Sequence, residues 1–186
     1  IRIFTAQPGG CSDFTARLVA RGISDSLGQP VIVENRASSV IAAEIVSKAP
    51  PDGYSLVSWG NTLWIGALLY KTPYDPMRDF SPVTLVGRGP HILVIHPSLP
   101  VKSVKELIAL AKARSGELNY ASTTAGSPLH LAGELLKSVA RVNIVRVNYQ
   151  ATGPAVIGLI SGETQLMFPN VNAGMPHVKT GKLVAL

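Results

Sequence analysis

The sequence predicts an α/β protein of two lobes, each with a mostly parallel central sheet flanked by helices. Two observations support this class: apolar segments of strand length alternate with segments of helical periodicity, and only short loops separate them. A third observation concerns domain organisation. Two prolines within Pro97–Pro100 interrupt the chain. We expect the boundary there, between lobe 1 (1–98) and lobe 2 (99–186).

Lobe 1 is expected to begin with a strand, a turn and an amphipathic helix. Phe14, Leu18 and Ile23 fall on one helical face, and Gly28 ends the pattern. An irregular, proline-rich connection follows at 70–82. The expected strands are 1–5, 31–34, 54–58, 83–86 and 92–95, and the expected helices are 14–27 and 41–48.

Lobe 2 begins with a capping box, in which Ser103 and Glu106 satisfy the first N–H groups of a helix that Gly116 closes. Pro128 opens the next helix, which carries apolar residues up to Val139. The remaining expected elements are strands at 118–121, 144–147, 165–168 and 183–186 and helices near 154–161 and 173–179.

Composition excludes several classes of protein. With 46% hydrophobic and 15% charged residues, the 186-residue chain is too apolar to be disordered, and no run is long enough to cross a bilayer. The net charge of +6 comes from scattered basic residues, which form no nucleic-acid patch and suit at most a mild attraction of anionic small molecules. Cys11 is the single cysteine, so neither an internal disulfide nor a cysteine metal cage can form.

Two loops share the plan of strand, Gly/Ser-rich turn and helix N-terminus: TAQPGGCSDF (5–14) and YASTTAGSPLHL (120–131). Free N–H groups and the helix dipole favour an anion at such an end, and glycine lets a ligand approach the backbone. Ser127 is a good N-cap, and Ser12 or Asp13 can cap the first helix. One loop in each half suggests a ligand clamped at the carboxyl ends of the strands.

Catalytic and metal chemistry find little support. The motifs of a nucleophile elbow, a P-loop and a dinucleotide-binding turn are absent, and the histidines at 91, 96, 130 and 177 lack metal-ligand spacing. We therefore expect no enzyme, metal or cofactor. A hydrolase using Cys11 or Ser127 stays open as a minor alternative, which predicts ester turnover that Cys11→Ala or Ser127→Ala abolishes.

Two further features have open interpretations. His130 is either a solvent-facing helix residue or a donor to the ligand. Trp59 and Trp64 flank Asn61 and Thr62, and they either pack ordinarily or form an apolar wall beside an amide donor, which would suit a small organic acid.

Strings along the whole chain resemble the Bug-type receptors of tripartite tricarboxylate transporters. They are PGGCSD, GQPVIVENR, KAPPDGYSL, LYKTPYDPMRDFSPVTLV, HPSLPVKSVKELIALAKA, LNYASTTAGSPLHLAGELLK, YQATGPA, LMFPN and PHVKTGKLVAL, in the expected order. The resemblance implies a periplasmic binding protein of type II. Such a receptor loses a signal peptide, holds a small carboxylate between its lobes, closes about a hinge near 95–100, and delivers cargo to membrane transporter subunits without entering the membrane or binding nucleic acid.

The resemblance also implies which residues contact the ligand. They are Pro8, Gly9, Gly10, Ser12, Asp13, Asn61, Thr62, Ser122, Thr124, Gly126, Ser127, His130 and Asn170.

Three departures from the family pattern bear on these contacts. The segment Ala37–Val40 is shorter than its family counterpart and lacks glycine, and Pro169 replaces a usual aspartate. Family members are also longer, so we expect that a returning segment which completes lobe 1 is missing here.

The same two-lobe architecture occurs in the effector-binding domain of LysR-type transcription regulators, which is the alternative interpretation. The sequence preceding Ile1 discriminates the two, because a receptor has a signal peptide there and a regulator has a helix-turn-helix.

Overall fold

The computed structural model describes the backbone of residues 1–186 and every side chain except that of Cys11. The chain divides into two compact units, Ile1–Gly87 (unit 1) and Arg88–Leu186 (unit 2). The boundary lies before the expected one at 98/99, because Val94 and Ile95 pair with strands of unit 2. Among the described residues, no helix combines the length and apolar character that crossing a bilayer requires.

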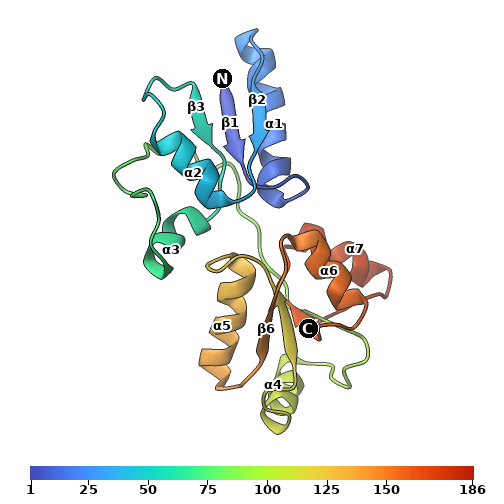
Figure 1. Ribbon diagram of the computed structural model, residues 1–186. Coiled ribbons are helices and arrows are strands. Elements are labelled where there is room, and N and C mark those ends of the chain that lie inside the picture. The colour runs from blue at the N-terminus through green and yellow to red at the C-terminus, as the bar shows by residue number, and fades with distance from the viewer. The chain divides into compact units, whose positions relative to one another are not determined.

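Unit 1 is built around a parallel sheet of three strands in the order β2-β1-β3. Its elements are β1 (Arg2–Thr5), α1 (Cys11–Leu27), β2 (Ile32–Asn35), α2 (Ser39–Ser47), β3 (Ser55–Val57) and α3 (Thr62–Leu69). Helices α1 and α2 cover opposite faces of this sheet (Figure 1). Neighbouring residues Leu56 and Val57 accordingly join different apolar clusters, as the two-residue period of a strand requires.

Unit 2 has a mixed sheet of five strands in the order β6-β5-β7-β4-β8. Its elements are β4 (Val94–Ile95), α4 (Val104–Ala113), β5 (Asn119–Ser122), α5 (Pro128–Ala140), β6 (Val145–Asn148), α6 (Thr152–Ile160), β7 (Leu166–Met167), α7 (Val171–Lys179) and β8 (Val184–Ala185). Strands β5, β6 and β7 are parallel, and β4 is antiparallel to both β7 and β8. Four of the six strand pairs in the two sheets are parallel, which confirms mostly parallel pairing in α/β lobes for the two sheets together.

Two apolar clusters on opposite faces of this sheet form the core of unit 2. Tyr120 and Leu166 belong to one cluster, and the next residues along the chain, Ala121 and Met167, belong to the other. Each fully buried large side chain contributes about 1.5–3 kcal/mol to folding. Gly133 of α5 packs against the Tyr120 ring, where a Cβ atom would overlap ring carbons.

The structure differs from two sequence-based expectations. Residues 81–90 form no strand, although one was expected at 83–86, and Val83 and Leu85 are exposed. The apolar alternation there is real, but no described strand pairs with it. Conversely, α3 was not expected, because its eight residues TLWIGALL are nearly all apolar and show no helical periodicity.

Candidate binding loops at the strand ends

In unit 1, the predicted ligand residues lie at the carboxyl end of the sheet. The three strands are parallel, so the loops after Thr5, Asn35 and Val57 all leave from their carboxyl ends. The loop 6–10 contacts the loop after β2, since the Gln7 side-chain amide donates to the Ala37 carbonyl at 3.1 Å. Ser38 caps α2 by accepting from the Ile41 N–H. The glycine-free segment 37–40 therefore forms an ordinary helix start.

Asp13 organises the first loop from inside. Its carboxylate accepts from the Gly9 N–H at 3.1 Å, from Asn35 Nδ2 at 2.8 Å and from Arg17 Nε at 3.1 Å, and only 6% of the residue is exposed. Burial raises the pKa of Asp13, but the hydrogen bonds from Asn35, Arg17 and Gly9 outweigh it and hold the pKa below its usual value. The structure thus gives Asp13 a role in holding the loop.

The rest of this loop is open. Pro8 and Gly9 are exposed, and Gly9 has a φ of 79°, a left-handed conformation that favours glycine. Gly10 occupies the N-cap position of α1, and no side chain caps the helix there. Ser12, in the first turn, is partly exposed. An uncapped helix start of this kind can receive hydrogen-bond acceptors from outside.

Asn61 and Thr62 begin α3 after the third strand of the same sheet. Asn61 occupies the N-cap position without capping the helix, and its Oδ1 atom is buried with no hydrogen-bond partner. Thr62 is 9% exposed. Trp59 packs against the cluster that contains Ala43, as ordinary packing predicts, whereas Trp64 is 40% exposed. Only Trp64 is open enough to serve as an apolar wall.

In unit 2, the loop after β5 is tightly hydrogen bonded within itself. Ser127 caps α5 by accepting from the His130 N–H at 3.3 Å, and its own N–H donates to the Thr124 carbonyl at 3.0 Å. Gly126 has a φ of 80°, and Ser122 is fully buried at the end of β5. Thr124 is the exposed residue of the loop. This loop is preformed, and Thr124 is its most accessible polar side chain.

His130 faces this loop and is held in one tautomer. The Gly126 N–H donates to its Nδ1 atom at 3.0 Å, so the neutral ring carries its proton on Nε2. Burial lowers the pKa of His130, and the positive charge of Arg146 lowers it further. The ring is partly exposed. It can therefore offer a neutral N–H donor.

The third parallel strand of this sheet, β7, is followed by a helix whose start is capped. Asn170 caps α7, with its Oδ1 atom accepting from the Ala173 N–H at 2.8 Å, and its backbone pairs with His91. Pro169 is buried, and its carbonyl accepts from the Ile92 N–H at 3.0 Å. Because the Oδ1 atom of Asn170 is engaged, its side-chain NH2 group is the one that stays available for a ligand.

Two features of this edge were not predicted from the sequence. Helix α6 starts at Thr152 without a side-chain cap. The start lies next to the loop after β5, since the Tyr149 N–H donates to the Ser122 carbonyl at 2.9 Å. Arg146 of β6 reaches under loop 123–127, with its Nε atom 3.3 Å from the Ser122 hydroxyl. A helix was expected near 154–161 and starts at Thr152, and only the strand register places Arg146 here.

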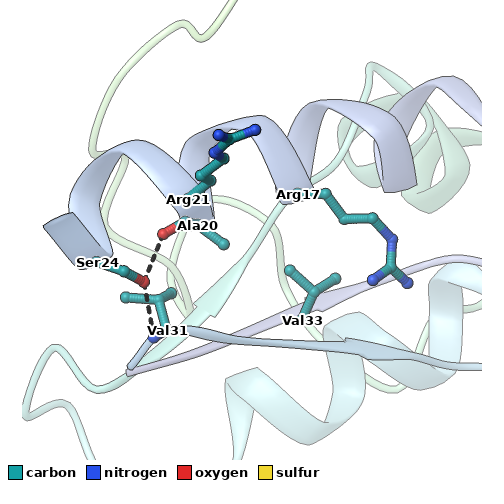
Figure 2. Close-up of a pocket in the computed structure, with 6 residues that line it drawn as sticks. All are labelled: Arg17, Ala20, Arg21, Ser24, Val31 and Val33. Carbon is teal, nitrogen blue, oxygen red and sulfur yellow. Dashed lines mark hydrogen bonds between the residues drawn. The ribbon is translucent and has the colours of Figure 1, made fainter. Parts of the chain in front are cut away.

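Two surface grooves of unit 1 lie apart from the predicted contacts. Figure 2 shows the first, of about 310 Å³, between α1 and β2, where the Ser24 hydroxyl donates to the Ala20 carbonyl and accepts from the Val31 N–H. The second, of about 600 Å³, is mostly apolar and lies between α3 and residues 70–77. The dashed lines in Figure 2 pair the Ser24 hydroxyl with the Ala20 carbonyl and the Val31 N–H, so this serine offers a ligand little to recognise.

The hydrolase alternative gains no geometric support from the described side chains. The Ser127 hydroxyl accepts from the backbone N–H of His130, while the ring Nδ1 of His130 accepts from Gly126. The pair therefore does not have the nucleophile–base contact that acyl transfer needs. Cys11, the other nucleophile considered, has its side chain outside the described part of the chain.

Comparison with known proteins places the chain in a family. Residues 15–186 match the model of the tripartite tricarboxylate transporter family receptor. Protein BugT of Bordetella pertussis is 40% identical over 184 residues, which are 96% of this chain and 56% of BugT. The chain thus spans about half the length of the curated relatives it matches.

Solved structures agree with this placement. The R. palustris protein Rpa4515, determined with adipate, superimposes with a TM-score of 0.91 at 35% identity, over all of this chain and 64% of that one. MatC from Rhodopseudomonas palustris, determined with bound malate, gives a TM-score of 0.84 at 30% identity, over 100% of this chain and 66% of MatC. The two-lobe fold of periplasmic binding proteins is confirmed.

Proposed function

The chain belongs to the tripartite tricarboxylate transporter receptor family, which is a family of substrate-binding receptors, and from this premise we propose that it captures a small organic carboxylate. The match over residues 15–186 carries the proposal. Two relatives were solved with adipate and malate, and both ligands are dicarboxylates. The complete receptor would work in the periplasm after loss of a signal peptide, and it would deliver its ligand to transporter subunits in the membrane.

The chemistry at the strand ends is consistent with a carboxylate ligand. Each unit has an uncapped helix start, at Cys11 and at Thr152, and each has further polar groups at the same end of its sheet. In unit 1 these are Ser12 and Asn61, and in unit 2 they are Thr124, His130 and Asn170. Micromolar affinity needs about −8 kcal/mol, which several hydrogen bonds and partial desolvation can supply.

We place the hinge in the exposed connection near Gly87, where the two units meet along the chain. The original expectation of residues 95–100 is less suitable, because Ile95 and Leu99 belong to the apolar core of unit 2. Closure would be a rigid-body movement of the units.

A thermal-shift screen of the receptor at full native length tests the proposal. We expect adipate, malate or a related acid to raise the melting temperature by about 5–10 °C at a hundredfold excess over Kd. The matching diamides and alcohols serve as controls of similar size. Stabilisation by sugars or cations, with none by any acid, would contradict the proposal.

A pair of serine variants tests the loop of unit 1. Ser12→Ala should weaken binding of the stabilising acid several-fold, whereas Ser26→Ala, at the other end of α1, should leave the affinity unchanged. Equal affinities for both variants would remove Ser12 from the site.

A further inference from the structure

Arg146 makes three hydrogen bonds at the start of the binding loop of unit 2: one to the end of β5, one to the loop itself and one within β6. Its strand position lies opposite Tyr120, and Asn148 lies opposite Ser122. The guanidinium donates to the Ser122 hydroxyl at 3.3 Å, to the Asn148 Oδ1 atom at 2.9 Å and, by a short contact, to the Thr123 carbonyl. It therefore fixes the first residues of the loop against the neighbouring strand.

The charge of Arg146 has no carboxylate partner within 4.0 Å among the described side chains, and all three of its acceptors are neutral oxygens. The carboxylate on the facing helix, Glu134, is engaged by the Tyr120 hydroxyl and the Lys137 ammonium. Five other arginines do pair with carboxylates: Arg2, Arg17, Arg36, Arg78 and Arg114. A partly buried, uncompensated positive charge thus lies beneath loop 123–127.

The contact with Thr123 also determines how one peptide group is oriented. The C=O of Thr123 points at the guanidinium and accepts a second hydrogen bond from the Ser122 hydroxyl at 3.2 Å. Because a trans peptide places its C=O and N–H on opposite sides, the N–H of Thr124 points away from Arg146. A carbonyl directed at an anionic ligand would repel it, whereas an N–H group attracts it.

We infer that Arg146 is a positioning residue of the carboxylate site, which holds the Thr123–Thr124 peptide with its N–H outward and supplies the positive charge that selects an anionic ligand. The inference rests on the proposed function and adds a source of specificity within it. Both effects act before the ligand arrives, so binding does not have to reorganise the loop.

The test compares ligand pairs that differ in charge, using the receptor at full native length. Binding of adipate and of its uncharged diamide, and of malate and its diamide, is measured by calorimetry in low salt for wild type, Arg146→Gln and Arg146→Lys. Arg114→Gln is the matched control. It removes the same charge from an exposed side chain of unit 2 that precedes β5, at the end of the sheet opposite the loop.

We expect Arg146→Gln to weaken binding of the preferred dicarboxylate about tenfold or more and that of the diamide by less than about threefold. Arg146→Lys should recover part of the charge preference, because lysine keeps the charge without the planar fork. Added salt should weaken acid binding more in wild type than in Arg146→Gln. Far-UV circular dichroism and the melting temperature establish that each variant is folded.

Two results overturn the inference while leaving the function intact: equal loss of acid and diamide binding in Arg146→Gln, or an acid-specific loss of the same size in Arg114→Gln. If wild-type receptor binds none of these acids and no other acid of the screen, the proposed function fails, and the inference fails with it.

Discussion

The two units use the same α/β plan but bury their sheets to different degrees. Unit 2 has five strands and two apolar clusters that close both faces of its sheet. Unit 1 has three strands and two smaller clusters, and it exposes large apolar side chains at Phe14, Leu68 and Val83. The comparison teaches that loops for a binding site need only parallel strands that end together. The stability of a unit depends on how much apolar side-chain surface is buried against both faces of its sheet. Both faces of the unit 1 sheet carry a helix, but its apolar clusters contain fewer buried residues than those of unit 2.

Producing the two units as separate proteins tests most directly whether they differ in stability. We expect residues 88–186 to form a monomer with a cooperative urea transition, because their core clusters are complete. Residues 1–87 should self-associate or lack such a transition. Size-exclusion chromatography with light scattering and urea titration measure both. A monomeric 1–87 with a cooperative transition would show that its exposed apolar surface is tolerated.

Two glycine variants compare the packing of the units directly. Gly133→Ala in α5 should cost about 1–3 kcal/mol, because the new methyl group overlaps the Tyr120 ring. Gly22→Ala in α1 should stabilise by about 0.5–1 kcal/mol, because no atom lies within 4 Å of the added Cβ. Denaturant titration of the full receptor gives both values, and a neutral Gly133→Ala would mean that α5 can shift away from the sheet.

Asp13→Asn examines the interior of the unit 1 loop. Loss of the carboxylate weakens the bonds from Gly9, Asn35 and Arg17, which should cost about 1–2 kcal/mol at neutral pH. Since folding lowers the pKa of Asp13, its contribution is present above the unfolded pKa and is lost as pH falls through the folded pKa.

The wild type should therefore lose its advantage over Asp13→Asn in acid, as melting temperatures between pH 6 and 2 will show. Asp25→Asn, on the exposed side of the same helix, is the control. A pH-independent difference would assign the effect to shape and not to charge.

The smallest effect concerns His130 in unit 2. Its folded pKa lies below the unfolded value, so the unfolded chain binds the proton first, and stability falls as pH drops below about 6.5 toward the folded pKa. Between pH 7 and 5 the wild type should lose about 1–2 °C more in melting temperature than His130→Gln. Parallel curves of melting temperature against pH would show that protonation of His130 does not change the stability.

Local sequence signals predicted most helix and strand positions, but not the pairing of every segment. Ser103 accepts from the Glu106 N–H as expected, although the Glu106 carboxylate reaches the N–H of Lys102. The segment 83–86 shows that alternation alone does not make a strand, because pairing requires a neighbour. Helix α3 was missed since its apolar residues lack a period.

For the site, the two loops were found from their glycines and caps, but the partners of their side chains depend on register. Asp13 was assigned to the ligand, and its bond with Asn35 joins residues 22 positions apart, which no local pattern reports. Arg146 lies in the alternating strand Val-Arg-Val-Asn, where a charged residue ordinarily indicates a solvent-facing position. Only the pairing of β5 with β6 brings it under the loop.

The hydrogen bond from the Gly126 N–H to His130 Nδ1 determines which chemical groups the ring can bind. With Nδ1 occupied by a backbone donor, the neutral imidazole can present only a proton to its surroundings and never a lone pair. An ammonium group, a hydroxyl proton or a metal ion that approached Nε2 would meet a hydrogen atom. One backbone hydrogen bond thus fixes this ring as a donor, which suits an oxygen acceptor and offers a cation no lone pair.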